Sequence, residues 1–441
     1  MLPTQRLSSF VENFARCVKQ PMLLLIAVAS IASPAAAQAY RTDQPVEAAK
    51  RNAGLATGSV LDPSRYATEK VKVLEYFNQY YFPAMTRTGP DELRALGDLR
   101  YNLFKRFLWA TTNEEYQRDL TMAALQAMGK VVTANPPYHP AVRYNAILII
   151  GMLDQQYAIE NQRPPTPLAA ATTALTKIVD RASTDQFPPP VTLGALVGLE
   201  RHTRYKDKLD PAAIEAISAA LLKLVNEEKP IQEMDRDTFA WLQLRAAGVL
   251  AQIGSVGKNN GVHDGIIKLV EKFKSLDDRA AAAALLAKIK YEGAKVDGAP
   301  AAEAVLKLAR DMGEAESKRA EEFEEGHAQG GSGAFMQGRG EFMPGGITGE
   351  EEEERFPRRH VLARLTDLKT GLTATKPIAP KVAQARIDAV LKAIEPAIKA
   401  AQNKELVELR LTGAIHTMAG AIDLAATPPK NAAAEEENVK F

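Results

Sequence analysis

The histidines and acidic residues are the side chains of this chain best suited to acid–base or metal chemistry. The six histidines show no H-E-x-x-H or comparable ligand spacing, and they stand at positions 139, 202, 263, 327, 360 and 416. Weak divalent-cation binding at the glutamate run Glu350–Glu354 is conceivable, but the run lacks the alternating ligands and the glycine of a calcium loop, so we interpret it as a solvated charge run. Asp235 and Asp237 precede an expected helix, where aspartates usually serve as caps. The sequence predicts no metal site, no cofactor and no catalytic residue.

One loop comes close to a nucleotide-binding motif. Residues 254–259 read Gly-Ser-Val-Gly-Lys-Asn and contain the Gly-Lys pair of a phosphate-binding loop. That motif also needs a glycine five residues before the pair, Ser or Thr after the lysine, and a strand leading in. Gln252, Asn259 and an expected helix occupy those places, so we interpret the segment as a loop between helices. A G-x-S-x-G elbow is also missing from the sequence.

Aromatic residues near the N-terminal end are the remaining candidates for a site. Between Tyr66 and Tyr116 lie 11 of the 28 Phe, Trp and Tyr residues, a density that suits a stacking platform for sugars or for the side chains of a partner. Many of them fall at core spacing, so we favour a bulky first repeat that closes the end of a core. Tyr144 and His139 are the residues to inspect if the chain is instead an enzyme of the helical-toroid kind.

The first 39 residues have the layout of a secretory signal peptide. Basic residues come first, a largely apolar run covers Met22–Ala32, and small residues follow up to Ala39. This order predicts cleavage after Ala37 or Ala39. The apolar run has about half of the roughly 20 residues that a membrane-spanning helix needs, so we favour export over a membrane anchor. The mature protein is expected in the periplasm or outside the cell.

The composition of the mature chain argues against nucleic-acid partners, thiol chemistry and a membrane-spanning segment. Without residues 1–39 the chain keeps 52 Lys and Arg against 53 Asp and Glu, a balance that argues against nucleic-acid binding. The single cysteine, Cys17, lies within the predicted signal, which leaves the mature chain without a thiol. The longest apolar runs, Ala146–Leu153 and Ala280–Ala287, have about eight residues, so we expect no integral membrane segment after signal removal.

The elements that carry these side chains are expected to be α-helices. In the stretch His139–Asp154 apolar residues recur at three- and four-residue steps, and from Ala146 onward they cover nearly the whole circumference. This pattern predicts an interior helix. Alternating polar and apolar runs, which would indicate strands, are nearly absent, so we expect an all-α fold.

From about Asn113 the expected helices come in antiparallel pairs. Pro or Asp marks many of the starts, because proline fits the first helical turn and aspartate caps its N–H groups. The expected first helices are 114–132, 167–182, 211–227 and 262–274, and the expected second helices are 139–154, 190–204, 236–254 and 277–291. Such serial pairs are typical of a helical repeat array.

The second helices share a spacing that resembles the HEAT repeat. Offsets of 3, 7, 8 and 10 residues lead from Arg143 to Ala146, Ile150, Gly151 and Leu153, from Gln243 to Ala246, Leu250, Ala251 and Ile253, and from Arg279 to Ala282, Leu286, Ala287 and Ile289. The inner helix of a HEAT unit similarly reads Asp or Pro, Val-Arg, Ala and Leu-Gly-x-Ile. Arg143 and Arg279 are 136 residues apart, which is three units of about 45. The resemblance covers about residues 113–292 and implies a right-handed α-solenoid whose second helices line the concave side.

The small residues at offsets 3 and 8 are expected to let neighbouring helices approach closely, with Ile150 and Leu286 buried between units. The unit near Pro190 departs from the pattern, because Pro190 replaces the arginine and Glu200 the last apolar residue. Gly198 nevertheless suits its small position.

The predicted organisation has six parts. They are a signal peptide at 1–39, an extended leader at 40–65, a HEAT-like array at 66–325, a disordered Gly- and Glu-rich linker at 326–357, C-terminal helices closing the array at 358–425, and a flexible tail at 426–441. A long helix from Ala301 is expected to leave the core at 314–325, where apolar periodicity fades. In the linker, Phe335-Met336 is echoed by Phe342-Met343; these pairs either dock into a groove or, as we favour, belong to a tolerated loop insertion.

These features favour a non-catalytic, exported helical-repeat protein that offers a binding or scaffold surface to a macromolecule, most simply a protein. Two alternatives stay open. One is a polysaccharide-degrading enzyme of the α/α-toroid type, and the other is an envelope protein that assembles with itself.

Overall fold

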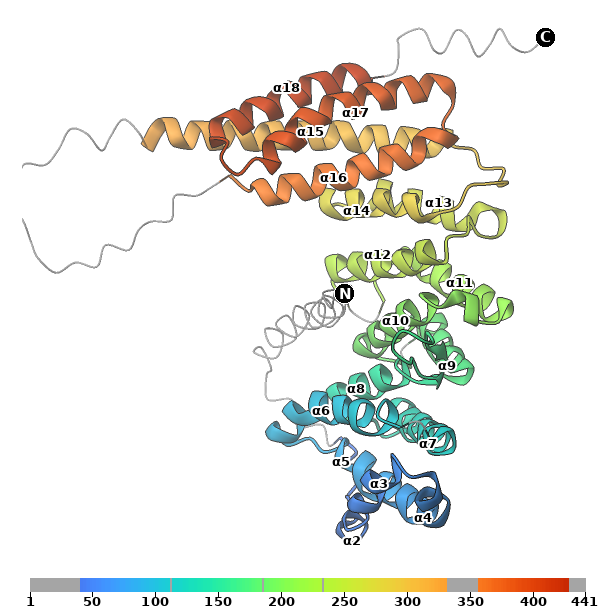
Figure 1. Cartoon of the computed structure of the whole chain (residues 1–441). Coiled ribbons are helices and arrows are strands. Elements are labelled where there is room, and N and C mark those ends of the chain that lie inside the picture. Colours follow the sequence, from blue (N-terminus) through green and yellow to red (C-terminus); the bar gives the residue numbers. More distant parts are fainter. Residues whose placement is uncertain (1–39, 112, 185, 232–233, 331–355, 428–441) are drawn as a thin grey trace, which may run out of the picture.

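The computed structural model describes residues 40–111, 113–184, 186–231, 234–330 and 356–427, with only the backbone described for 327–330 (Figure 1). The predicted signal peptide, residues 331–355 of the predicted linker and residues 428–441 of the tail lie outside these ranges. Helices dominate the described chain, as predicted, and a short antiparallel strand pair is formed by β1 (Asp154–Gln156) and β2 (Thr166–Pro167). No helix in the described ranges combines the length and the apolar character needed to cross a membrane.

Helix pairs follow one another through the middle of the chain. They are α7 (Glu114–Thr133) with α8 (Pro140–Ile150), α9 (Ala169–Asp180) with α10 (Pro189–Thr203), α11 (Pro211–Asn226) with α12 (Arg236–Ile253), and α13 (Gly261–Lys272) with α14 (Leu276–Leu285). Contacts run in series along α8, α10, α12 and α14, and separately along α9, α11 and α13. In Figure 1 these odd-numbered helices follow one edge of an elongated column and the even-numbered helices the other.

Local chemistry sets the ends of these helices as predicted. Asn113, Asp210 and Asp235 each accept hydrogen bonds from backbone N–H groups of the helix that follows. Gly254 ends α12 with a φ of 81°, a left-handed conformation that favours glycine. The segment that begins there connects α12 to α13, as the loop interpretation predicted.

One position of the second helices has the same role in three pairs. A buried side chain there donates to the last carbonyls of the preceding helix, which have no partner within that helix. The donors and acceptors are Arg143 to Val132, Gln243 to Leu224, Val225 and Glu227, and Arg279 to Val270, at 2.8–3.1 Å. The predicted offsets therefore begin at a side chain that joins the two helices of a pair.

The prediction of close helix approach is confirmed where α8 meets α10 and is wrong for Ala287, at offset 8 of the last unit. A Cβ built on Gly151 would lie 2.7 Å from the Cα of Gly198, so the contact requires glycine. Ile150 and Leu286 are buried, as predicted. Ala287 is exposed, because α14 ends at Leu285 and the tighter 3₁₀ turn that follows rotates this position off the packed face.

The expectation of an extended leader at residues 40–65 is wrong, because much of this segment is helical. Residues 40–65 include α2 (Glu47–Lys50), α3 (Ala53–Ser59) and the start of α4 (Pro63–Tyr76). The helices form because Ala56 and Val60 are buried against α4 and its neighbours, and the Val60 carbonyl accepts a hydrogen bond from the Thr111 hydroxyl at 2.5 Å. After α4 follow a π-helical turn η1 (Phe77–Tyr81), α5 (Phe82–Ala84), α6 (Pro90–Asn102) and a second π-helical turn η2 (Leu103–Leu108).

The aromatic residues of this end form a core, as we favoured. Eight of the 11 aromatics between Tyr66 and Tyr116 are buried. Phe77 is the centre, with its ring edge-on to that of Phe107 at 5.0 Å between centroids. A free stacking platform is therefore not what these side chains form.

The C-terminal block consists of α15 (Ala299–Gly330), α16 (Arg358–Thr375), α17 (Lys381–Gln402) and α18 (Glu408–Ala426), which cross the top of the column in Figure 1. The expectation that α15 leaves the core at 314–325 is wrong, because Glu316 and Ala320 are fully buried and α15 packs along α18. The predicted linker also begins too early, since the backbone stays helical to Gly330. At its other end Phe356 is buried, with its ring 5.4 Å from that of Phe323. Pro396 lies inside α17, which continues to Gln402.

Candidate binding surface

A row of aromatic and charged side chains crosses the helices on the side of the column formed by the second helices. We define the second-helix face by Arg100 of α6, Tyr144 of α8, Glu200 of α10, and Trp241 and Arg245 of α12. These helices contact one another in series, α6 with α8, α8 with α10 and α10 with α12. The row is therefore assembled from four helices that are far apart in the sequence.

Trp241 and Arg245 form the most accessible part of the face. They are four residues apart and thus lie on the same side of α12, with the guanidinium carbon of Arg245 5.9 Å from the centre of the Trp241 ring. Arg245 Nη2 also lies 2.5 Å from a carboxylate oxygen of Glu200, whose other oxygen lies 3.1 Å from Arg204. Trp241 is 40% exposed, an unusual position for a large aromatic side chain. The ion pairs hold the arginine beside the indole.

Tyr144 and Arg100 continue the face toward the N-terminal end. The Tyr144 ring lies against Gly194, where an added Cβ would be 3.3 Å from the ring. Burial raises the pKa of Tyr144, so the hydroxyl stays protonated at neutral pH. Arg100 Nη1 lies 2.5 Å from the amide oxygen of Asn145, and no carboxylate of the described residues pairs with it. Burial lowers the pKa of Arg100.

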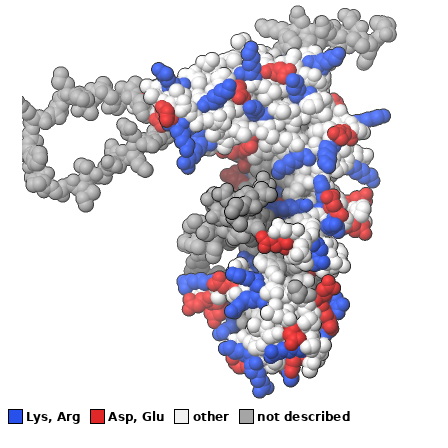
Figure 2. All heavy atoms as spheres, in the orientation of Figure 1, with Lys and Arg blue, Asp and Glu red and all other residues white. Residues whose placement is uncertain are grey.

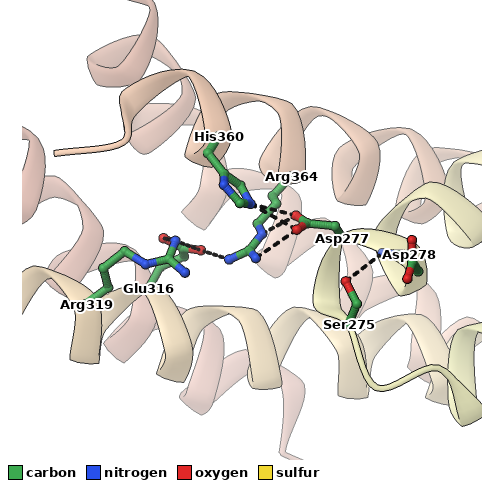
Figure 3. A network of polar contacts seen from close by, with 7 residues as sticks. All are labelled: Ser275, Asp277, Asp278, Glu316, Arg319, His360 and Arg364. Carbon is green, nitrogen blue, oxygen red and sulfur yellow. Dashed lines mark hydrogen bonds and ion pairs between the residues drawn. The ribbon is translucent and has the colours of Figure 1, made fainter. Parts of the chain in front are cut away.

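A network of ion pairs joins the last helix pair to the C-terminal block (Figure 3). Arg364 of α16 lies between the carboxylates of Asp277 in α14 and Glu316 in α15, and Arg319 also pairs with Glu316 at 3.1 Å. His360 Nε2 approaches Asp277 to 2.8 Å. Hydrogen bonds from Arg364 and His360 lower the pKa of Asp277, so its carboxylate stays charged. The network fixes three helices relative to one another.

Acidic groups gather beside this network. Burial, together with the charges of Asp277 and Asp237, raises the pKa of Asp278, and burial with Asp277 raises that of Asp367. Figure 2 shows acidic side chains in the recess beneath the C-terminal block. In the described ranges no three acidic, histidine or cysteine residues are placed to hold a metal ion. The cluster thus brings carboxylates of α12, α14 and α16 together beside the network.

The residues singled out from the sequence have separate positions in the fold. His139 is the N-cap of α8, where Nδ1 accepts the Ala141 N–H at 3.2 Å and the ring meets Tyr40 edge-on. In the described chain no hydrogen bond or ring contact joins it to Tyr144, the other residue to inspect for a toroid enzyme. Asp235 accepts the N–H groups of Asp237 and Thr238, which confirms its interpretation as a cap.

The other histidines whose side chains are described lie in separate places in the fold. The ring of His202 is fully buried and its Nδ1 lies 2.9 Å from the Thr172 hydroxyl. His263 meets the hydroxyl of Tyr291, and His416 that of Ser317. Each of these contacts joins two helices or a helix and a following loop. The side chain of His327 is outside the described residues.

The sequence did not identify four members of the face as candidate binding residues: Trp241, Arg245, Arg100 and Glu200. The four-residue spacing of Trp241 and Arg245 was a usable signal, because it places an indole and a cation together on one helix. Nothing local indicates that Glu200 lies beside Arg245, since that contact depends on α10 packing against α12.

Comparisons with protein-family models, with curated proteins and with solved structures found no match for this chain.

Proposed function

We propose that this protein is an exported right-handed α-solenoid of the HEAT type, and that it acts as a scaffold that binds another protein through the second-helix face. The single observation that carries the proposal is the exposed Trp241 held beside Arg245. Tryptophan, tyrosine and arginine are the residues that most often dominate the energy of protein interfaces. The face places all three types on adjacent helices.

The order of contacts between helices supports the solenoid part of the proposal. Second helices contact second helices in series, and three of the pairs share a side chain that caps the preceding helix. Such nearest-neighbour packing gives repeat proteins their long binding surfaces. Small-angle scattering tests the shape: a radius of gyration near about 22 Å, which a compact domain of this length would have, would contradict it.

The two tryptophans of the chain provide a matched test of the binding face. Trp241 and Trp109 are 40% and 51% exposed, and only Trp241 belongs to the face. The tagged mature chain is used to capture partners from the envelope fraction of its source, and the dissociation constant is then measured for the protein recovered. Trp241→Ala is expected to weaken binding about 30-fold or more, because a hot-spot residue contributes about 2 kcal/mol or more.

Trp109→Ala is the control and is expected to leave the affinity unchanged within about twofold. Equal affinities for wild type and Trp241→Ala, or no reproducible partner, would overturn the proposal. Fractionation and N-terminal sequencing of the native protein test export separately, with a mature start at Gln38 or Tyr40 expected.

A further inference from the structure

The C-terminal block has a groove that the second-helix face does not include. It lies between α16 and α17 and has a volume of about 540 Å³. Its lining residues are Lys369, Thr373, Leu391, Lys392, Glu395, Pro396 and Lys399.

Positive charge exceeds negative charge in this groove. Lys369 Nζ lies 2.7 Å from Glu395, and this hydrogen bond lowers the pKa of the Glu395 carboxyl. No ion pair within the described chain engages Lys392 or Lys399, and both side chains extend from the exposed side of α17. Residues 356–427, which include α16–α18, hold 11 Lys and Arg against six Asp and Glu, whereas α15 of the same block is acidic. The lining itself, with three lysines against one glutamate, thus favours an anionic occupant.

Pro396 adds a backbone acceptor and an apolar surface. Proline has no N–H, so the carbonyl of Lys392, four residues earlier in α17, lacks its helical donor. Leu391 and the proline ring form apolar parts of the lining. A carbonyl acceptor, apolar surface and two unpaired ammonium groups match the N–H groups and carboxylates of an extended peptide.

We propose that the α16–α17 groove binds an extended, carboxylate-rich segment of a partner protein. A nucleic acid is less suited to it, because the lining has neither arginine for bidentate phosphate contacts nor an aromatic ring on which a base would stack. The proposal does not depend on the second-helix face, which is built from other helices.

The test uses the mature chain and a fluorescently labelled synthetic peptide with five consecutive glutamates, titrated by fluorescence anisotropy. Saturable binding that weakens as salt is added is expected. The double variant Lys392→Gln/Lys399→Gln should weaken it at least tenfold. The charge-matched control is Lys381→Gln/Lys404→Gln, which removes two exposed lysines outside the groove and should stay within twofold of wild type. Circular dichroism confirms that both variants fold.

Three outcomes would overturn the proposal. Equal weakening in both double variants would show non-specific attraction to the basic residues of α16–α18. Absence of saturable binding in every chain tested would exclude the groove as a site. The chain's own Glu350–Glu354 carries the same chemistry, so the titration is repeated with those residues changed to Gln; binding that requires this change would assign the groove to the chain itself.

Discussion

The guanidinium of Arg364 lies 2.5 Å from the carboxylate of Glu316, and the two side chains are only 10% and 0% exposed. They come from α16 and α15 and are 48 residues apart in the chain. A charge that is buried this deeply requires a charged partner, because only the attraction between the two offsets the free-energy cost of removing them from water. The pair therefore fixes α16 against α15 within the C-terminal block, while Asp277 joins Arg364 to the preceding α14.

Removing Arg364 should destabilise the protein strongly. Arg364→Met leaves the Glu316 carboxylate in the core with Arg319 as its remaining partner. We expect the free energy of unfolding to fall by about 3 kcal/mol, the lower end of the range for broken buried pairs, because Arg319 stays. Urea unfolding at pH 7 measures it.

Two companion variants separate charge burial from packing. Arg364→Met/Glu316→Leu should recover most of the loss, since apolar side chains of similar volume often replace a buried pair without cost. Arg319 is 34% exposed, so Arg319→Ala should cost less than about 1 kcal/mol. A loss below about 0.5 kcal/mol for Arg364→Met would show that the pair does not matter to stability.

Ile150 is the reference position for the packed layer between helix pairs. Its side chain is 1% exposed, so Ile150→Ala should lower the free energy of unfolding by about 2–5 kcal/mol through lost burial and a residual cavity. Val71 is 80% exposed, and Val71→Ala should stay within about 0.5 kcal/mol of wild type. Urea titrations measure the free energy of unfolding of both variants. A similarly small loss in both would contradict the burial of Ile150 in a packed layer between helix pairs.

The helices and their core faces were predictable because the signals are local. Periodicity over a few turns indicated the burial of Ile150 and Leu286, and residue type indicated the cap at Asp235. Arg143 and Arg279 were recognised as equivalent positions, and the structure gives them the same carbonyl-capping role. Offset 8 failed at Ala287 because the helix had already changed its pitch there.

Contacts between distant helices were not predictable. The stretch around Glu316 was predicted to leave the core, because its partner Arg364 lies beyond the linker and no local pattern reveals it. The second-helix face also depends on contacts between distant helices. The sequence singled out Tyr144, but its neighbours Arg100 and Arg245 come from other helices. A pattern within one helix carries no information about such partners.

Replacing glycine by alanine should have opposite effects at Gly151, in the contact between α8 and α10, and at Gly129, on the open side of α7. Gly151→Ala places a Cβ 2.7 Å from the backbone of Gly198 and should cost about 1–3 kcal/mol, because the helices must separate. Gly129 lies within α7 with no atom within 4 Å of an added Cβ, so Gly129→Ala should stabilise by about 0.5–1 kcal/mol. Thermal and urea unfolding measure both, and a neutral Gly151→Ala would contradict the contact.

His202 should make stability depend on pH in the acidic range. Burial lowers the pKa of its imidazole to about 3, whereas an unfolded histidine titrates near about 6.5. Between these values the unfolded chain binds a proton that the folded chain does not, so stability rises with pH through this window and is lost as pH falls below about 6.5. The slope contributed is up to about 1.4 kcal/mol per pH unit. His202→Asn keeps a hydrogen-bonding group toward Thr172 and does not titrate, so urea unfolding from pH 4 to 7 should show a flatter profile than wild type. Parallel profiles for the two proteins would mean that the imidazole accepts its proton in the folded state.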